Sequence, residues 1–169
     1  MTTLLLARHG ETIDNVRQIM QGQTQGKLTP KGVLQAEELA ARLADVDIQA
    51  FIASDLKRSI DTCTVIARQH GQVVRTTPLL RERDWGDFTG LFIPDLKDKV
   101  WPTNIESLEQ LKDRARRFLD MVSKDYPNAT VLAVGHGIIN KAIQSVFYDK
   151  PMKEVPRMTN AEVRTLLLK

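Results

Sequence analysis

The stretch Leu4-Leu5-Leu6-Ala7-Arg8-His9-Gly10-Glu11-Thr12 decides the fold class, because a short apolar run leads directly into an Arg-His pair. An apolar run of this length is typical of a strand that is buried on both faces. Open α/β sheets bind ligands at the carboxyl ends of such strands. We therefore predict a strand from Thr3 to Arg8 that delivers Arg8 and His9 to a functional site. An isolated Arg-His pair is more often a solvated strand end, so the rest of the chain must decide.

A second histidine has the same setting. The apolar run from Thr130 to Val134 ends at Gly135 and leads into His136 and Gly137. The third histidine, His70, instead closes a helical pattern and precedes Gly71, which is what helix termination favours. We therefore expect His9 and His136 at strand ends and a structural role for His70.

The remaining elements alternate between strand and helix. Strands are expected at 50–53, 73–76 and 163–168, and helices after the Thr29-Pro30 start, after a Ser54-Asp55 cap, after a capping box at Ser107 to Gln110, and from about 138 to 148. Alternating strands and helices predict an α/β fold, a three-layer sandwich with a mostly parallel central sheet covered by helices on both faces. The chain of 169 residues is expected to be a single domain, 1–169, with a short lid at about 92–105, its least regular stretch.

Composition limits the partners. The net charge of +3 suits a small anion, but it is too weak and dispersed for a nucleic-acid surface. The basic cluster of Lys112, Arg114, Arg116 and Arg117 is expected to be the solvated face of a helix. The lone Cys63 cannot form an internal disulfide, which favours the cytoplasm. Because no basic residue precedes the first apolar run and this run leads straight into Arg8, we expect neither a signal peptide nor a membrane span there. The oligomeric state is left open.

Several nucleotide, thiol and metal chemistries are disfavoured. The segment from Gly22 to Thr29 lacks the spacing of a phosphate-binding P-loop. Cys63 lacks the glycine-rich turn of a cysteine phosphatase, so we expect it to pack in the core. The histidines have no second ligand at a spacing that would preform a metal site. We therefore expect neither a metal nor a cofactor.

Five residues together supply the parts of a phosphoryl-transfer site. The two strand-end histidines His9 and His136, with Arg8, Arg58 and Glu82, together supply a nucleophile, a set of cations for a phosphoryl group and a proton donor. Arginines beside His9 favour its neutral, nucleophilic imidazole, and their planar forks match the oxygens of a transferring phosphoryl group.

Further motifs follow in order along nearly the whole chain. They are Arg8-His9-Gly10-Glu11-Thr12 with Asn15, Gln21-Gly22, Leu28-Thr29-Pro30-Lys31-Gly32 with Gln35-Ala36, Ser54-Asp55-Leu56-Lys57-Arg58-Ser59 with Thr62, Leu80-Arg81-Glu82 with Gly86-Asp87-Phe88-Thr89-Gly90, Glu106-Ser107, and Val134-Gly135-His136-Gly137. With these motifs in this order, the chain resembles the histidine phosphatase superfamily, which has the phosphoglycerate mutase-like fold.

The resemblance implies a phosphatase that hydrolyses a small phosphomonoester through a covalent phosphohistidine on His9, with Glu82 as acid and then base. It assigns phosphoryl binding and the pocket lining to a further set of residues, Arg8, Arg58, His136, Asn15, Gln21, Gly22 and the Gly137 amide. Two departures bear on the activity. Gln25 stands where the family often has an aspartate, and the segment between Gly90 and Glu106 is shorter than in mutase-like members, which argues for hydrolysis.

Three alternatives stay open. A phosphohistidine protein phosphatase would suit a short chain with an open cleft, although a phosphorylated imidazole leaves without much help from an acid such as Glu82. A phosphoglycerate mutase shares the motifs, and a non-catalytic module that binds a phosphorylated ligand is the rival outside enzymes.

Overall fold

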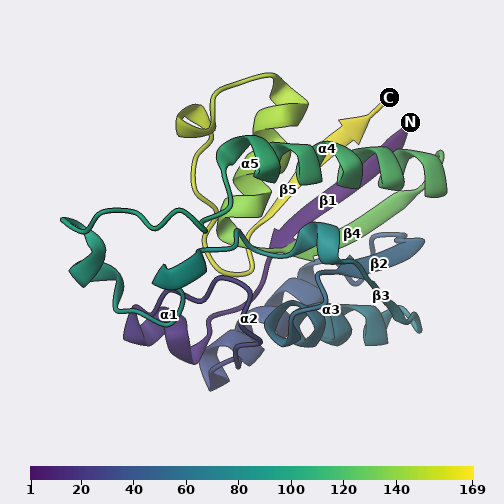
Figure 1. Ribbon diagram of the computed structural model, residues 1–169. Helices are drawn as coiled ribbons and strands as arrows, with labels where there is room; N and C mark the ends of the chain where they lie inside the picture. Colours follow the sequence, from purple (N-terminus) through teal and green to yellow (C-terminus); the bar gives the residue numbers. More distant parts are fainter.

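The computed structural model describes residues 1–169, and its central layer is a five-stranded sheet in the order β3-β2-β4-β1-β5 (Figure 1). The strands are β1 Thr2–Arg8, β2 Ala50–Ala53, β3 Val74–Thr76, β4 Thr130–Gly135 and β5 Val163–Leu168. Neighbouring strands from β3 to β1 run parallel, whereas β5 runs antiparallel to β1. The expectation of a mostly parallel sheet is confirmed.

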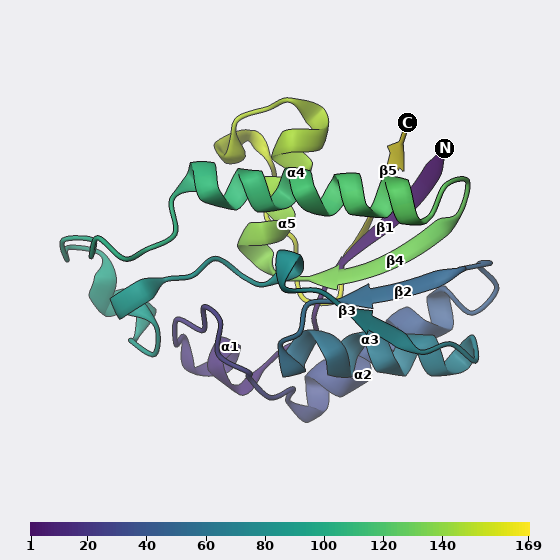
Figure 2. The same cartoon turned by 45° about the vertical axis from the view of Figure 1, so that its right-hand side comes forward.

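Helices cover both faces of this sheet (Figure 2). They are α2 Pro30–Arg42 and α3 Lys57–Gln69 on one face, and α4 Leu108–Asp125 and α5 Gly137–Tyr148 on the other. The helices of each pair also pack against each other. The predicted three-layer α/β sandwich is therefore confirmed.

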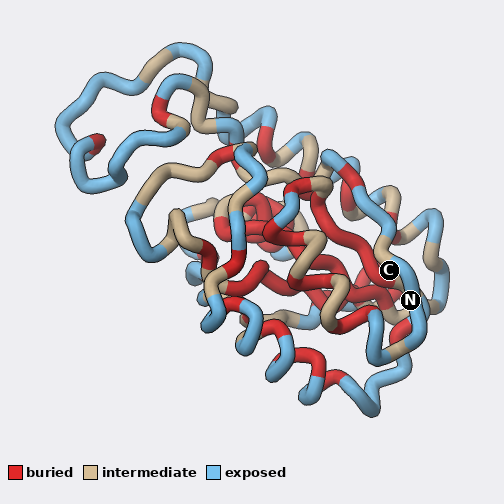
Figure 3. The backbone as a smooth tube through the Cα atoms, turned by 90° about the horizontal axis from the view of Figure 1, so that it is seen from below, coloured by how far each residue is buried: buried red, intermediate tan, exposed pale blue.

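Alternation along the strands builds two separate cores. In β1, Leu4 and Leu6 pack toward α4 and α5, whereas Leu5 and Ala7 pack toward α2 and α3. Such alternation follows from the two-residue period of strand side chains. Figure 3 shows the buried residues gathered in the middle of the molecule, with exposed residues around them. Because β1 is apolar on both faces, it lies inside the sheet with helices on either side, and this position also holds its carboxyl end in place.

The starts of three helices test the capping predictions. Thr29 caps α2 with Pro30 in the first turn, and Ser107 forms a capping box with Gln110 at the start of α4, both as predicted. The predicted Ser54-Asp55 cap of α3 is wrong, because the N-cap is Leu56 and it has no side-chain bond. Both side chains have other partners. The Ser54 hydroxyl lies 2.7 Å from His136 Nε2, and the Asp55 carboxylate pairs with a loop arginine.

Short helical elements occupy the connections. The five-residue helix α1, Ile13–Arg17, follows β1 directly and was not expected. It is held by a capping box between Thr12 and Asn15 rather than by an apolar face. Short 3-10 helices lie at Pro78–Leu80, Gly86–Phe88, Ile93–Leu96 and Met152–Glu154.

The segment between Gly90 and Glu106 extends away from the sheet (Figures 1 and 2). It is mostly exposed, but Leu96 is buried. Trp101 packs edge-on against Trp85 at 5.5 Å between ring centroids, so the segment is tied to the loop before it. None of the helices combines the length and hydrophobicity that crossing a bilayer demands.

One prediction about the surface needs correction. Lys112, Arg116 and Arg117 are wholly or partly exposed, but the Arg114 side chain is only 15% exposed and makes an ion pair with Glu106. Spacing along α4 could not reveal this, because the partners of Arg114 come from loops that precede the helix.

Candidate active site

The register of the sheet brings the two strand-end histidines together. Arg8 of β1 lies opposite Gly135 of β4 in a parallel pair, so the residues that follow, His9 and His136, leave the sheet side by side. Their ring centroids lie 5.1 Å apart. Two parallel central strands therefore build the centre of the site at their carboxyl ends.

His9 is held as a neutral imidazole with one free nitrogen. Its Nδ1 lies 2.7 Å from the carbonyl oxygen of Gly10. A carbonyl can only accept, so Nδ1 carries the proton and Nε2 keeps a lone pair. Burial, followed by the positive charges of Arg58 and Arg8, holds the pKa of His9 well below its usual range. This is the form of histidine that can attack phosphorus.

His136 is fixed by two serines. Its Nε2 lies 2.7 Å from Ser54 Oγ and 3.0 Å from Ser59 Oγ, and its buried Nδ1 has no partner in the protein. Burial and the nearby Arg58 charge hold the pKa of His136 well below its usual range. Because a serine hydroxyl can donate to Nε2, the ring proton is free to reside on Nδ1, where an anion would accept it.

Two buried arginines flank His9. Arg8 donates from Nη1 to the Met158 carbonyl at 2.8 Å, and its Nε has no partner. Arg58 donates to the carbonyl oxygens of Gly22, at 2.8 Å, and Thr24, while its Nε also lacks a partner. Burial is the main cause that lowers the pKa of Arg58 to about 10, so it remains a cation at neutral pH.

The unpartnered nitrogens point to an anion. An unsatisfied buried donor is costly, and three of them, Arg8 Nε, Arg58 Nε and His136 Nδ1, belong to residues grouped around His9. A phosphoryl group offers the acceptor oxygens that these donors lack. The arrangement is therefore suited to binding an oxyanion next to the free nitrogen of His9.

Glu82 enters from the loop after β3. Its carboxylate accepts hydrogen bonds from the backbone N–H groups of Arg83, Ile138 and Ile139, at 2.9 to 3.1 Å. The last two N–H groups belong to the first turn of α5, where the helix dipole favours a negative charge. Oε1 takes most of these bonds, so Oε2 keeps the freer lone pairs. The fold thus brings the predicted acid to the side of the site formed by α5.

The remaining predicted residues surround the same space. Asn15 and Gln21 use their carbonyl oxygens to accept from Thr12, at 3.0 Å each, which leaves their NH₂ groups for a ligand. Gly22 has a φ of +52°, a left-handed conformation that glycine adopts readily, and its carbonyl holds Arg58. A Cβ built on Gly137 would meet Arg8 Nε at 3.6 Å and Glu82 Oε2 at 3.8 Å. Gly137 therefore lies where these two groups approach each other.

All of the predicted site residues except His136 and Gly137, which lie behind the cavity wall, line one cavity of about 350 Å³. Its polar wall contains Arg8, His9, Asn15, Gln21, Gly22, Arg58 and Glu82, and its apolar wall contains Ile19, Met20, Trp85, Ile93 and Ile138. Lys141 and Arg157 also line it, and sequence reasoning missed both of these cations. Neither belongs to a motif, and only the fold brings them to the cavity.

A larger groove of about 760 Å³ lies beside the start of α4. Its lining includes the carboxylates of Asp84, Glu109 and Asp113. These negative charges would repel a phosphate dianion. The smaller cavity at the strand ends is therefore the candidate active site.

Residues outside the cavity lining hold the site residues in place by hydrogen bonds. Ser54 and Ser59 orient His136, and the Thr62 hydroxyl accepts from the Gly10 amide at 3.1 Å. All three stand in motifs that the sequence offers, but spacing alone gives no role to a serine or threonine on a helix. Asn160 donates to the His9 carbonyl at 3.1 Å from a loop that no motif marks.

The residues predicted to lie outside the site do so. His70 is the C-cap of α3, as expected for a structural histidine. Cys63 is fully buried in the core under α2 and α3, and burial raises the pKa of its thiol to about 12. A thiol with that pKa stays protonated at neutral pH, so it does not act as a nucleophile.

The comparisons with known proteins agree with this geometry. Residues 4–169 match the model of the histidine phosphatase superfamily (branch 1). The uncharacterized phosphatase PhoE of Bacillus subtilis (strain 168) is 33% identical over 166 residues, which cover 95% of this chain and 86% of that protein. A metal-independent phosphoserine phosphatase of Arabidopsis thaliana is 33% identical over 160 residues, which cover 85% of this chain and 67% of that protein. The solved structure of YhfR from Bacillus stearothermophilus has a TM-score of 0.89 and 30% identity, and covers 98% of this chain and 90% of its own. The chain therefore belongs to branch 1 of the histidine phosphatase superfamily.

Proposed function

We propose that this protein is a metal-independent phosphatase that hydrolyses a small phosphomonoester through a phosphohistidine on His9. One observation carries the proposal. The Nδ1–H of His9 donates to the Gly10 carbonyl, so the free lone pair is on Nε2, in a cavity that two buried arginines line. A neutral imidazole nitrogen beside fixed positive charges is suited to attack a phosphate ester.

The rest of the reaction follows from the neighbours of His9. Nε2 attacks phosphorus and the ester oxygen departs, while Arg8, Arg58 and His136 neutralise the charge on the phosphoryl oxygens. Glu82 in its protonated form donates the proton of Oε2 to the departing oxygen and becomes the carboxylate that the amides of α5 stabilise. In the second half-reaction the Glu82 carboxylate removes a proton from water, which attacks the phosphohistidine and restores His9.

The cavity supports a small-molecule substrate. Its volume of about 350 Å³ lies at the lower end of the range for small-ligand sites. A relative at 33% identity acts on phosphoserine, as its name states, and we infer a substrate of similar size without choosing among phosphorylated metabolites. We also propose a single domain with a short lid at 92–105, which the position of Ile93 in the cavity wall supports. We propose a cytoplasmic location as well, which the lone Cys63 supports.

Trapping the intermediate tests the nucleophile. A labelled phosphomonoester, quenched during turnover, should leave a protein-bound label that survives alkali and is lost in acid, as a phosphoramidate is. His9→Ala should abolish the label. His70→Ala, a matched histidine outside the cavity, should retain it. Label that persists in His9→Ala and disappears in His136→Ala would move the nucleophile to His136.

Chelation tests metal independence. The arginines supply the charge that a metal ion would otherwise supply, and no three metal-ligating side chains lie together in the structure. Excess chelator should therefore leave kcat/KM for an aryl phosphate unchanged. A loss that only added divalent cation reverses would overturn this part of the proposal.

The alternatives differ in where the phosphoryl group goes. A phosphoglycerate mutase would return it to a second hydroxyl of the substrate, a phosphohistidine protein phosphatase would act on a phosphorylated protein, and a binding module would release no phosphate. Free phosphate released from a panel of phosphorylated metabolites, with isomerisation assayed in parallel, separates these outcomes. The exposed segment between Gly90 and Glu106 favours hydrolysis, because a mutase must keep its intermediate away from water.

A further inference from the structure

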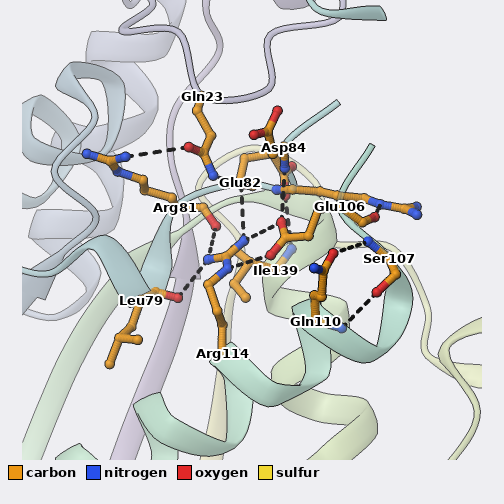
Figure 4. A network of polar contacts seen from close by, with 11 residues as sticks. Gln23, Leu79, Arg81, Glu82, Asp84, Glu106, Ser107, Gln110, Arg114 and Ile139 are labelled. Carbon is orange, nitrogen blue, oxygen red and sulfur yellow. Dashed lines mark hydrogen bonds and ion pairs between the residues drawn. The ribbon is translucent and has the colours of Figure 1, made fainter. Parts of the chain in front are cut away.

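The loop that carries Glu82 has no regular secondary structure from Arg81 to Trp85. Its backbone carbonyls therefore lack the partners that a strand or helix would give them. Arg114 supplies partners for two of them and for one carbonyl of the 3-10 helix just before the loop. Its guanidinium donates to the carbonyl oxygens of Leu79 at 3.0 Å, Arg81 at 2.8 Å and Glu82 at 3.2 Å (Figure 4).

Glu106 completes this arrangement. Its carboxylate accepts from Arg114 Nε and Nη2, both at 2.8 Å, in a two-pronged ion pair. All five N–H groups of the arginine thereby have acceptors. The Glu106 and Arg114 side chains are only 11% and 15% exposed. Burial of Glu106 opposes its charged form, but the hydrogen bonds from Arg114 and the Asp84 amide outweigh it and lower its pKa.

Glu106 also holds the other side of the same loop. Its Oε1 accepts from the Asp84 amide at 3.0 Å, and its own amide donates to the Asp84 carbonyl at 2.8 Å. Arg83 Nε donates to the Glu106 carbonyl at 2.8 Å. Residues before and after Glu82 are thus fixed to one ion pair on the outer side of the loop. On the inner side, the Glu82 carboxylate bonds to the first turn of α5.

We propose that the Arg114–Glu106 ion pair is a clamp that positions Glu82 for proton transfer. Arg114 does not line the cavity, so it is a positioning residue and acts through Glu82. The inference rests on the proposed function, because only a general acid needs this placement. A displacement of about 1 Å is enough to lower catalysis markedly in a preorganised site.

The test compares two substrates. An alkyl phosphate needs a proton on its leaving oxygen, whereas an aryl phosphate with a stable phenolate needs little help. The ratio kcat/KM reports phosphoryl transfer to His9, and the inhibition constant of inorganic phosphate reports anion binding separately. Where water attacks the phosphohistidine more slowly than the phosphohistidine forms, the burst of phenolate on mixing with the aryl phosphate gives the fraction of active protein, and otherwise the amplitude of thermal unfolding gives the folded fraction.

Arg114→Gln should lower kcat/KM for the alkyl phosphate by roughly 10- to 100-fold, within the range that general acid catalysis contributes. The aryl phosphate should lose less than about threefold, and the inhibition constant of phosphate should stay constant. Arg114→Lys should restore only part of the loss, because a point charge cannot hold two carboxylate oxygens and three carbonyls together. Arg75→Gln, which removes an exposed ion pair between β3 and the end of α4, is the matched control and should change neither substrate.

A double-mutant cycle decides whether Arg114 acts through Glu82. In a Glu82→Gln background, Arg114→Gln should cause no further loss on the alkyl phosphate. Equal losses on both substrates per active molecule, or a full additional loss in that background, would make Arg114 a purely structural residue and overturn the clamp. Glu106→Gln, which keeps the shape of the side chain, gives the same test if Arg114→Gln does not fold. A wild-type protein that hydrolyses neither substrate would instead refute the proposed function.

Discussion

Arg58 is among the largest fully buried side chains, and it has two tasks at once. Its terminal nitrogens hold the carbonyls of Gly22 and Thr24, while Nε remains for a ligand. A lysine has one nitrogen and cannot serve both tasks. The anion site and the loop of residues 22–24 therefore depend on the same guanidinium.

Substitution of Arg58 should separate charge from geometry. Arg58→Lys should lower kcat/KM by roughly tenfold or more, the worth of one or two charge-assisted hydrogen bonds. Arg58→Ala should lower it by roughly 10²- to 10³-fold, as for other groups that stabilise transition-state charge. Steady-state kinetics with an aryl phosphate measures both. Arg68→Ala, an exposed arginine of the same helix, is the control and should keep full activity. Full activity in both Arg58 variants would remove Arg58 from the site.

Glu82 is the residue whose role most needs a test. Glu82→Gln removes the proton donor but keeps an oxygen for the amides of α5, so we expect the fold to persist. Hydrolysis of an alkyl phosphate should slow by roughly 10²- to 10⁴-fold, and that of an aryl phosphate much less. Equal slowing would make Glu82 a positioning or folding residue. If neither substrate slows, the acid lies elsewhere, at the exposed Asp84 or Asp87.

At the scale of elements, the first turn of α5 is the shared wall of the anion site and the acid site. Gly137→Ala tests its position, because the added methyl would lie 3.6 Å from Arg8 Nε and 3.8 Å from Glu82 Oε2, which is ordinary contact. We expect a protein that folds with unchanged Tm but whose kcat/KM falls by roughly tenfold or more, since the methyl occupies the space where reacting groups must meet. Thermal unfolding and kinetics on the same sample measure both.

Gly32→Ala is the contrasting variant. A Cβ there would lie 2.1 Å from the backbone oxygen of Glu11, so the chain itself must shift. This variant should lose stability first, with activity following the folded fraction. If Gly137→Ala instead behaved like Gly32→Ala, the space beside α5 would be a packing contact and not part of the site.

A comparison of the helices and strands with their predictions shows which of them the sequence could predict. Strands β1 and β4 were predictable because each is a dense apolar run that a histidine follows within one residue, and α4 because its capping box is local. Helix α1 was missed because five residues without an apolar face give no period to detect. The cap of α3 was wrong because Ser54 bonds to His136, 82 residues away.

The difference between features that local sequence marks and features that depend on distant residues also holds for the site as a whole. The candidate site could be assembled from sequence wherever a strand end or a motif marked its residues, as for His9, His136 and Arg58. Lys141, Arg157 and the Arg114–Glu106 pair could not, because their place depends on how loops cross the sheet end. Sequence therefore marks the residues next to the strand ends, whereas residues that loops bring to the site are visible only in the fold.

The two buried histidines of the site make the stability of the folded protein depend on pH. Burial and the nearby arginines hold the pKa values of His9 and His136 well below the usual value of about 6.5. In the unfolded chain both histidines bind a proton below that pH, whereas in the folded protein they bind it only at a lower pH. The histidines therefore cost the folded protein no stability above about pH 7, and they destabilise it increasingly as the pH falls.

We expect the free energy of unfolding to fall between about pH 7 and pH 5, by at most about 2 kcal/mol per histidine, from linkage with an unfolded pKa of about 6.5. Urea unfolding at several pH values measures it. The paired carboxylates of Asp55, Glu106 and Glu162, whose pKa values are lowered, lose their contribution only below about pH 4.5, so they do not mask the effect. His136→Asn should halve the slope of the free energy of unfolding against pH. A free energy of unfolding that stays constant from pH 7 to pH 5 would mean that both rings titrate alike in the folded and the unfolded protein, so that burial and the arginines would not hold His9 neutral at acidic pH.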